Sequence, residues 1–166
     1  MALVLGLNAI TCLGGDDITD PAFVVVRGLK DETVNADSAL ADVTTREAKG
    51  WRLQVATLSE GSVDAQMIYD VDNEDFQAFK DAFLNKTRVH MAFLNGDKTG
   101  DPDVPGGPGT GDGLVGGFSV TNFTIGRQLE EAIMVDLTFT IREDSEGNGP
   151  EWVDDQAFVY PGIFVP

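Results

Sequence analysis

Residues 131–142 read EAIMVDLTFTIR, and this stretch decides the class of fold. From Ile133 onward an apolar side chain recurs at every second position. Three of the positions between them carry Asp136, Thr138 and Thr140. A period of two places alternate side chains on opposite faces of a β-strand. The stretch therefore predicts a strand with one apolar and one polar face.

Residues 62–70, SVDAQMIYD, alternate in the same way and place Asp64 and Gln66 on the polar face. The preceding segment 51–58 is also typical of a strand, and Ser59-Glu60-Gly61 between the two is typical of a turn. We therefore expect segments 51–58 and 62–70 to pair as a β-hairpin.

The period changes over residues 72–84, DNEDFQAFKDAFL. Phe76, Phe79 and Phe83 recur with the spacing of one helical stripe, and Asp72 or Asn73 suits the N-cap position of this helix. This is the one helix that we expect, and its phenylalanine stripe should cover a sheet.

The rest of the chain predicts more strands, separated by two long irregular segments. Residues 30–50 are polar without a clear period, which favours a long loop or an extended hairpin. Residues 95–113 are dense in Gly, Pro and Asp, which favours a loop. The pattern predicts a mainly β fold, an antiparallel sandwich or barrel with one flanking α-helix. Its other strands are expected over residues 3–13, 22–29, 87–94 and 114–125.

The chain of 166 residues is strongly acidic, with a formal net charge of −17. Such a surface repels phosphates, which argues against ordinary nucleic-acid binding and against anionic membrane surfaces. The apolar N-terminal segment lacks a basic region and is too short to span a bilayer. We read this segment as a strand and expect synthesis in the cytoplasm without a signal peptide.

The residue types that support catalysis are scarce. His90 is the one histidine, and its place within a predicted strand favours a surface or interface position over a catalytic base. Cys12 is the one cysteine, so neither an intramolecular disulfide nor a thiolate zinc cluster can form. We therefore expect no enzyme, no catalytic residues, no cofactor and no bound metal.

A second hypothesis keeps a binding role open. Asp97, Asp101, Asp103 and Asp112 lie in or beside the glycine-rich segment, where they could gather calcium. Their spacing does not match the twelve-residue EF-hand loop. A calcium- or carbohydrate-binding β-sandwich module remains the alternative to a structural subunit.

Several short segments resemble a known family in their order and spacing. The chain resembles the tail tube, or major tail, proteins of long non-contractile phage tails, and the resemblance covers about residues 1–152. The matching segments are Ala41-Asp42-Val43-Thr44-Thr45-Arg46, Gly50-Trp51-Arg52, Val55-Ala56-Thr57-Leu58, Gly61-Ser62-Val63, Leu129-Glu130-Glu131-Ala132 and Pro150-Glu151-Trp152.

The resemblance implies a structural subunit that self-assembles into stacked, hexameric rings. The rings form the tail tube of a virion, a hollow conduit through which DNA passes without specific binding. It implies partners among other tail proteins, such as the tape measure and tail terminator proteins, and no membrane insertion of the subunit. Residues 1–152 would form the tube domain, and residues 153–166 a C-terminal extension that contacts a neighbouring subunit.

Two sets of residues follow as candidates. The polar positions of the two alternating strands are candidates to face the lumen: Asp64, Gln66, Asp136, Thr138 and Thr140. Basic and aromatic residues of the long polar segment and of the tail are candidates for contacts between subunits: Arg46, Lys49, Trp51, Arg52, Phe158, Tyr160 and Phe164.

Overall fold

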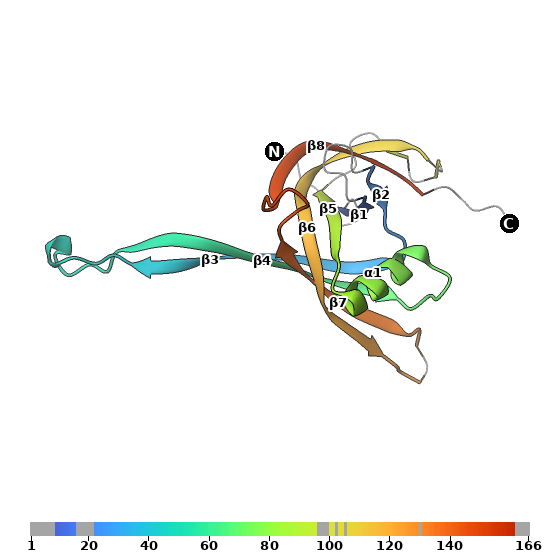
Figure 1. The fold of residues 1–166 in the computed structure, drawn as a ribbon, viewed down its shortest axis with the longest axis horizontal. Coiled ribbons are helices and arrows are strands. Elements are labelled where there is room, and N and C mark those ends of the chain that lie inside the picture. The colour runs from blue at the N-terminus through green and yellow to red at the C-terminus, as the bar shows by residue number, and fades with distance from the viewer. Residues whose placement is uncertain are drawn as a thin grey trace.

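The computed structural model describes residues 9–15, 22–95, 100–101, 103–104, 106–129 and 131–161. Eight strands of one sheet follow the order β3-β4-β7-β6-β5-β1-β2-β8 (Figure 1). Their bounds are β1 Ala9–Gly14, β2 Val24–Val25, β3 Leu29–Asp42, β4 Gln54–Ile68, β5 Arg88–Asn95, β6 Pro108–Gly126, β7 Met134–Arg142 and β8 Glu151–Val159. One α-helix, α1 Glu74–Asn85, and a short 3-10 helix, Arg46–Ala48, complete the described elements. The predicted mainly β fold with one flanking helix is confirmed.

The helix forms where the period predicted it. Asn73 caps the N-terminus, and its side chain accepts a hydrogen bond of 2.9 Å from the backbone N–H of Asp75. Phe76 and Phe79 are buried against the sheet, and Phe79 meets Phe139 of β7 edge-on at 5.1 Å between ring centroids. The phenylalanine stripe therefore joins α1 to the apolar face of β4, β5, β6 and β7.

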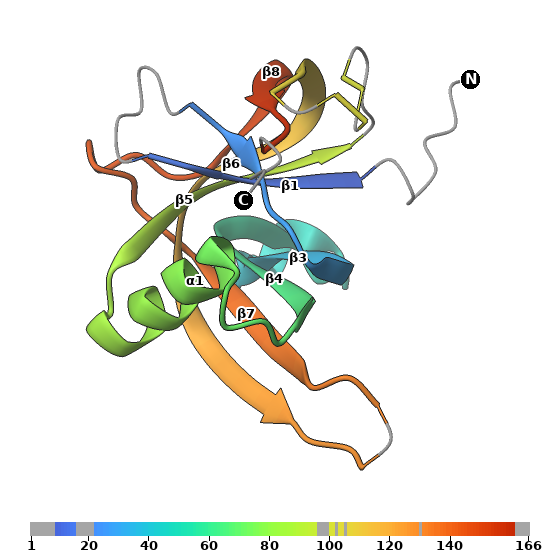
Figure 2. The same cartoon turned by 90° about the vertical axis from the view of Figure 1, so that its right-hand side faces the viewer.

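The other half of the sheet closes on itself. β8 pairs with both β2 and β6, so that β6, β5, β1, β2 and β8 make a closed ring of five strands (Figure 2). A second core cluster lies among them. It consists of Ile10, Cys12, Phe23, Ala92, Leu94, Val115 and Phe158. We call this part the small barrel.

The longest feature is a two-stranded arm. β3 and β4 pair antiparallel from Leu29 with Met67 out to Asp42 with Gln54. Their outer parts project away from the rest of the molecule (Figure 1). We call residues 36–60 the arm and residues 43–53 its tip.

The predicted hairpin of segments 51–58 and 62–70 is wrong, because both segments belong to the single strand β4. Ser59-Glu60-Gly61 does not turn, because β4 runs through it and pairs it with Ala36–Ser38 of β3. The polar segment 30–50 is accordingly mostly strand, and the turn lies at residues 43–53. Neither face of the arm packs on a core, so residues 36–42 of β3 carry no sustained apolar period from which this strand could be recognised.

The glycine-rich segment is also partly strand. β6 begins at Pro108, earlier than the predicted start at residue 114, and Gly109 and Gly113 are buried within it. A Cβ atom on Gly113 would lie 1.9 Å from the carbonyl oxygen of Phe93 in β5. A Cβ atom on Gly109 would lie 2.4 Å from the ring of Phe158. The glycines thus permit close approach of neighbouring groups, which turn statistics cannot reveal.

Candidate assembly surfaces

The five residues predicted to face a lumen lie together on one polar face. β4 and β7 pair with Asp64 opposite Thr138 and Gln66 opposite Asp136. The amide of Gln66 donates to Asp136 at 3.0 Å, and the hydroxyl of Thr138 donates to Asp64 at 2.8 Å. Thr140 lies on the same face, two residues after Thr138 in β7.

The outer strands extend this face on both sides. Asn35 of β3 donates its side-chain amide to Asp64 at 3.0 Å. Thr121 of β6 shares a hydrogen bond of 2.9 Å with Thr140. The register also places Thr33 beside Asp64, and Asn122 beside Thr138. The four strands β3, β4, β7 and the far half of β6 therefore present one hydrogen-bonded polar surface, which we call the polar face.

The polar face is acidic. Its middle forms a shallow hollow of about 310 Å³. Among the described residues that line the hollow, the charged ones are Asp31, Asp64 and Asp136, and none is basic. The opposite face of the same strands carries the buried side chains of the larger core. The face is therefore open to water and bears negative charge.

The sheet under the polar face has two open edges. β3 is the first strand of the order, and within the described chain it pairs with β4 alone. At the other side, β5 pairs with β6 only as far as Ser119, opposite Arg88, so residues 120–126 of β6 have β7 as their one described partner. Open strand edges present backbone N–H and C=O groups that can pair with another chain.

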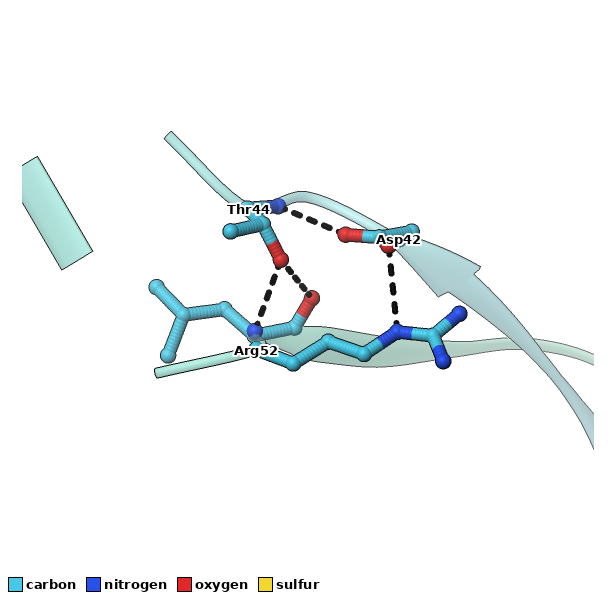
Figure 3. Close-up of polar contacts among 4 residues, drawn as sticks. Asp42, Thr44 and Arg52 are labelled. Atoms are coloured by element: carbon cyan, nitrogen blue, oxygen red, sulfur yellow. Dashed lines mark hydrogen bonds and ion pairs between the residues drawn. The ribbon is translucent and has the colours of Figure 1, made fainter. Parts of the chain in front are cut away.

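The tip of the arm is held in shape by its own polar contacts (Figure 3). The carboxylate of Asp42 accepts a hydrogen bond of 2.9 Å from the backbone N–H of Thr44 and forms an ion pair of 3.1 Å with Arg52. Together these hydrogen bonds lower the pKa of Asp42, those from Thr44 most strongly. The hydroxyl of Thr44 also accepts from the backbone N–H of Leu53 at 2.9 Å. The tip is an ordered projection.

Apolar side chains are exposed along the outer arm. Ala41 pairs with Val55, and Val43 donates its backbone N–H to Leu53 at 3.0 Å, so these four share one face. Val43, Leu53 and Val55 are each about half exposed, and Trp51 at the tip is 76% exposed. An ordered arm with this much apolar surface is typical of a contact site for another chain.

The candidate contact residues lie in different surroundings. Arg46, Lys49 and Trp51 are exposed at the tip, whereas Arg52 is paired with Asp42 of its own arm. The ring of Phe158 lies inside the small barrel at 2% exposure, with the partly buried Tyr160 edge-on to it at 5.6 Å. Phe158 therefore packs inside its own subunit, and Tyr160 packs against Phe158. Phe164 lies outside the described residues.

The predicted boundary between residues 152 and 153 falls inside β8. β8 pairs with β6 from Val115 opposite Glu151 to Pro108 opposite Val159. Up to Val159, the proposed C-terminal extension is thus an integral strand of its own subunit.

His90 and Cys12, the residues considered for chemical roles, are both buried. His90 is 6% exposed and packs beside Phe23 at 5.3 Å between ring centroids, which corrects the surface position expected for it. Cys12 is fully buried, and burial together with the nearby charge of Glu32 raises its pKa to about 12. Such a thiol is a poor nucleophile.

The described acids do not assemble into a metal site. No three His, Cys, Asp or Glu side chains among the described residues are arranged to hold one ion. Asp112 accepts a hydrogen bond of 3.1 Å from the backbone N–H of Asp155, and Asp101 accepts one of 3.0 Å from Asp103. Asp97 lies outside the described residues. In the part of the chain that the structure describes, no helix is long and apolar enough to cross a membrane.

Sequence reasoning missed the open edges and the apolar side of the arm. Which edges are open depends on which strands pair, and the backbone hydrogen bonds that pair strands do not require particular residue types. A weak signal for the arm exists, because Val43, Leu53, Val55 and Leu58 are apolar residues within an otherwise polar hairpin.

Comparison with known proteins agrees with this geometry. The family described as phage tail tube protein matches residues 13–142. The fold is similar to a chain of a native gene transfer agent virion, with 15% identity, a TM-score of 0.64, and coverage of 91% of this chain and 99% of that chain. It is also similar to a chain from the tail of an empty gene transfer agent particle refined with C6 symmetry, with 16% identity, a TM-score of 0.63 and coverage of 93% and 100%.

A third similar structure is the SPP1 tail tube, with 8% identity and a TM-score of 0.65 over 92% of this chain and 79% of that chain. No curated protein is significantly similar to this chain in sequence.

Proposed function

Because the chain belongs to the family of phage tail tube proteins, we propose that it closes into hexameric rings that stack into a hollow conduit for DNA. It is a structural subunit of a tail tube, as membership of this family establishes. The observation that carries the ring is the four-stranded sheet β3-β4-β7-β6, which is open at both edges. The C6 symmetry of the similar gene transfer agent tail supports six copies.

In this proposal the open edges pair with each other. Each strand of the sheet runs opposite to its neighbour, so β3 and β6 run in opposite directions. The β3 edge of one copy can therefore continue the sheet antiparallel to residues 120–126 of the next copy. Closure of the ring removes both edges and leaves a continuous barrel wall.

The polar face then lines the lumen. The larger core and α1 cover the other face, so the wall can present only Asp64, Gln66, Asp136, Thr138, Thr140 and their neighbours to the channel. Six copies would surround the channel with carboxylates that repel the phosphates of DNA. This supports passage of DNA without specific binding.

The arm then reaches beyond its own ring. Its tip projects from the molecule and carries Arg46, Lys49 and Trp51 on the surface. We propose that these residues contact the adjacent ring, and that Arg52 acts through the ion pair that orders the tip. Residues 160–166 remain candidates to reach a neighbour, including Phe164.

The proposal extends to partners and place. The tube belongs to the tail of the virion, and we propose that it assembles in the cytoplasm of the bacterial host, around a tape measure protein and up to a tail terminator protein. The family is structural, and we propose no enzymatic role and no membrane insertion for the subunit.

Disulfide trapping of the ring tests the proposed closure. One cysteine replaces Thr33 or Asn35 on β3, and a second replaces Asn122 or Thr124 on β6 of the same chain. At least one pair should give, without reductant, a covalent ladder that ends at six subunits, because side chains of paired strands lie about 5 Å apart. The single variants should stay monomeric on the same gel, since Cys12 is buried. Purified protein that forms neither rings nor tubes under negative stain would contradict the proposed function.

A further inference from the structure

A groove lies at the end of the molecule opposite the tip of the arm. It encloses about 690 Å³ where the start of β3, the end of β4 and the N-terminus of α1 meet. The arm tip and α1 lie at opposite ends of the longest axis (Figure 1), and Figure 2 looks onto the end that carries α1. A chain cannot place its own tip in its own groove, so any contact between the two needs a second copy.

Hydrogen bonds join two walls of the groove, and its charged residues are mostly acidic. Asp75 accepts a hydrogen bond of 2.9 Å from the backbone N–H of Arg27, and Asn73 donates to the carbonyl of Arg27 at 3.1 Å. These bonds hold the start of α1 against the segment before β3. The charged residues of the lining are one base and four acids: Arg27, Asp70, Asp72, Glu74 and Asp75.

The groove also offers apolar surface. Val24, Ile68 and Pro161 line it, and Ile68 is 42% exposed. The groove therefore combines a small apolar area with acidic groups, which suits an aromatic side chain flanked by basic residues.

The tip has the complementary composition. Residues 43–53 contain three basic residues and one acidic residue, a net charge of +2 in a chain of net charge −17. Trp51 is the most exposed aromatic side chain of the described residues. Trp and Arg are the residue types that contribute most to protein–protein contacts.

We propose that the tip of one copy docks in this groove of a copy in the next ring, with Trp51 against the apolar lining and Arg46 and Lys49 facing the acids Asp70, Asp72 and Glu74. This inference rests on the proposed function, and it identifies the surface that receives the arm. A contact between two different surfaces of identical chains is heterologous, and where it joins one ring to the next along the tube axis it does not close. It therefore stacks ring upon ring in one direction.

Charge reversal on the two surfaces tests the contact. We compare R46E/K49E at the tip, D72K/E74K at the groove, and the four-fold variant that exchanges the charges. Each double variant should raise the concentration needed for tube assembly more than about tenfold while rings persist, because like charges then face each other. The four-fold variant should restore tubes at least in part.

D81K on the exposed middle of α1 and R127E on the turn after β6 are matched controls, and both should assemble like the wild type. Circular dichroism establishes that each variant folds.

The outcomes separate the two proposals. Tubes that form from either double variant as readily as from the wild type would overturn the docking while leaving the ring intact. Wild-type protein that forms no rings would overturn the proposed function and this inference together. A photo-crosslinking residue in place of Trp51 gives a second readout on assembled tubes. Crosslinks to residues 68–75 of another copy support the docking, and crosslinks confined to other segments overturn it.

Discussion

The hydroxyl of Thr11 donates a hydrogen bond to the carboxylate of Glu32, and this bond joins β1 of the small barrel to β3 near the root of the arm. Burial raises the pKa of Glu32 above its ordinary value, although the bond from Thr11 opposes the shift. The folded chain therefore holds a proton on Glu32 to a higher pH than the unfolded chain does. As pH rises from the ordinary pKa of glutamate through the raised value, this site loses stability relative to the unfolded state.

Glu32→Gln should therefore stabilise the subunit at pH 7 and have little effect near pH 4. Glutamine matches the shape of the protonated acid and keeps an oxygen that can accept from Thr11. Thermal unfolding of the unassembled subunit at both pH values measures the difference. Glu60→Gln, on the exposed arm, is the control and should shift the melting temperature little at either pH. An equal effect of Glu32→Gln at pH 4 and pH 7 would contradict the assignment.

Cys12 should resist thiol reagents while the subunit is folded. The side chain is fully buried, and its pKa is raised to about 12, so almost no thiolate exists at pH 8. A disulfide reagent such as Ellman's should label no thiol in the native protein and one per chain in denaturant. Labelling of the native protein as fast as the denatured protein would mean that the small barrel opens readily.

Phe79→Ala should destabilise the subunit by about 3–5 kcal/mol. Phe79 is fully buried between α1 and the sheet, where it packs on Phe139. Leu84→Ala, on the exposed side of the same helix, should change stability by no more than about 0.5 kcal/mol. Urea unfolding below the assembly concentration compares the two variants. Similar losses in both would mean that α1 does not pack as described.

Gly113→Ala should cost at least about 1–3 kcal/mol, because the new methyl group would collide with the backbone of β5. Gly149→Ala is the matched control, since a Cβ atom there meets no atom within 4 Å. If both variants unfold at the same urea concentration, β5 and β6 do not approach each other as closely as the structure has them.

The sequence predicted those elements that pack on the larger core. The helix predicted over residues 72–84, which the structure places at 74–85, and the alternating strands around Asp64 and Thr138 are confirmed, because one face of each meets apolar residues and the other meets water. The same alternation correctly placed the five polar candidates on one face. Periodicity therefore sufficed wherever burial is one-sided.

Other features depend on interactions that the sequence does not display. At the inner end of the arm, Ser59-Glu60-Gly61 lies in a strand because it pairs with Ala36–Ser38 of β3. Gly113 lies in a strand because only glycine allows Phe93 to approach so closely. Phe158 was predicted to contact another subunit, but its ring lies in the small barrel. The sequence could not distinguish the two, because a strand that packs on its own chain has the same apolar composition as one that packs on a neighbour.

The polar face is formed by an even number of alternating strands, and this has a consequence for the size of the tube. In the proposed ring every added copy begins and ends with strands of opposite direction, so five, six or seven copies would meet with the same antiparallel seam. Hydrogen bonding at the seam therefore cannot select the circumference. We propose that the twist of the sheet makes that selection, and α1 packs on the outer face of this sheet, so the bore would depend on residues that never touch the channel.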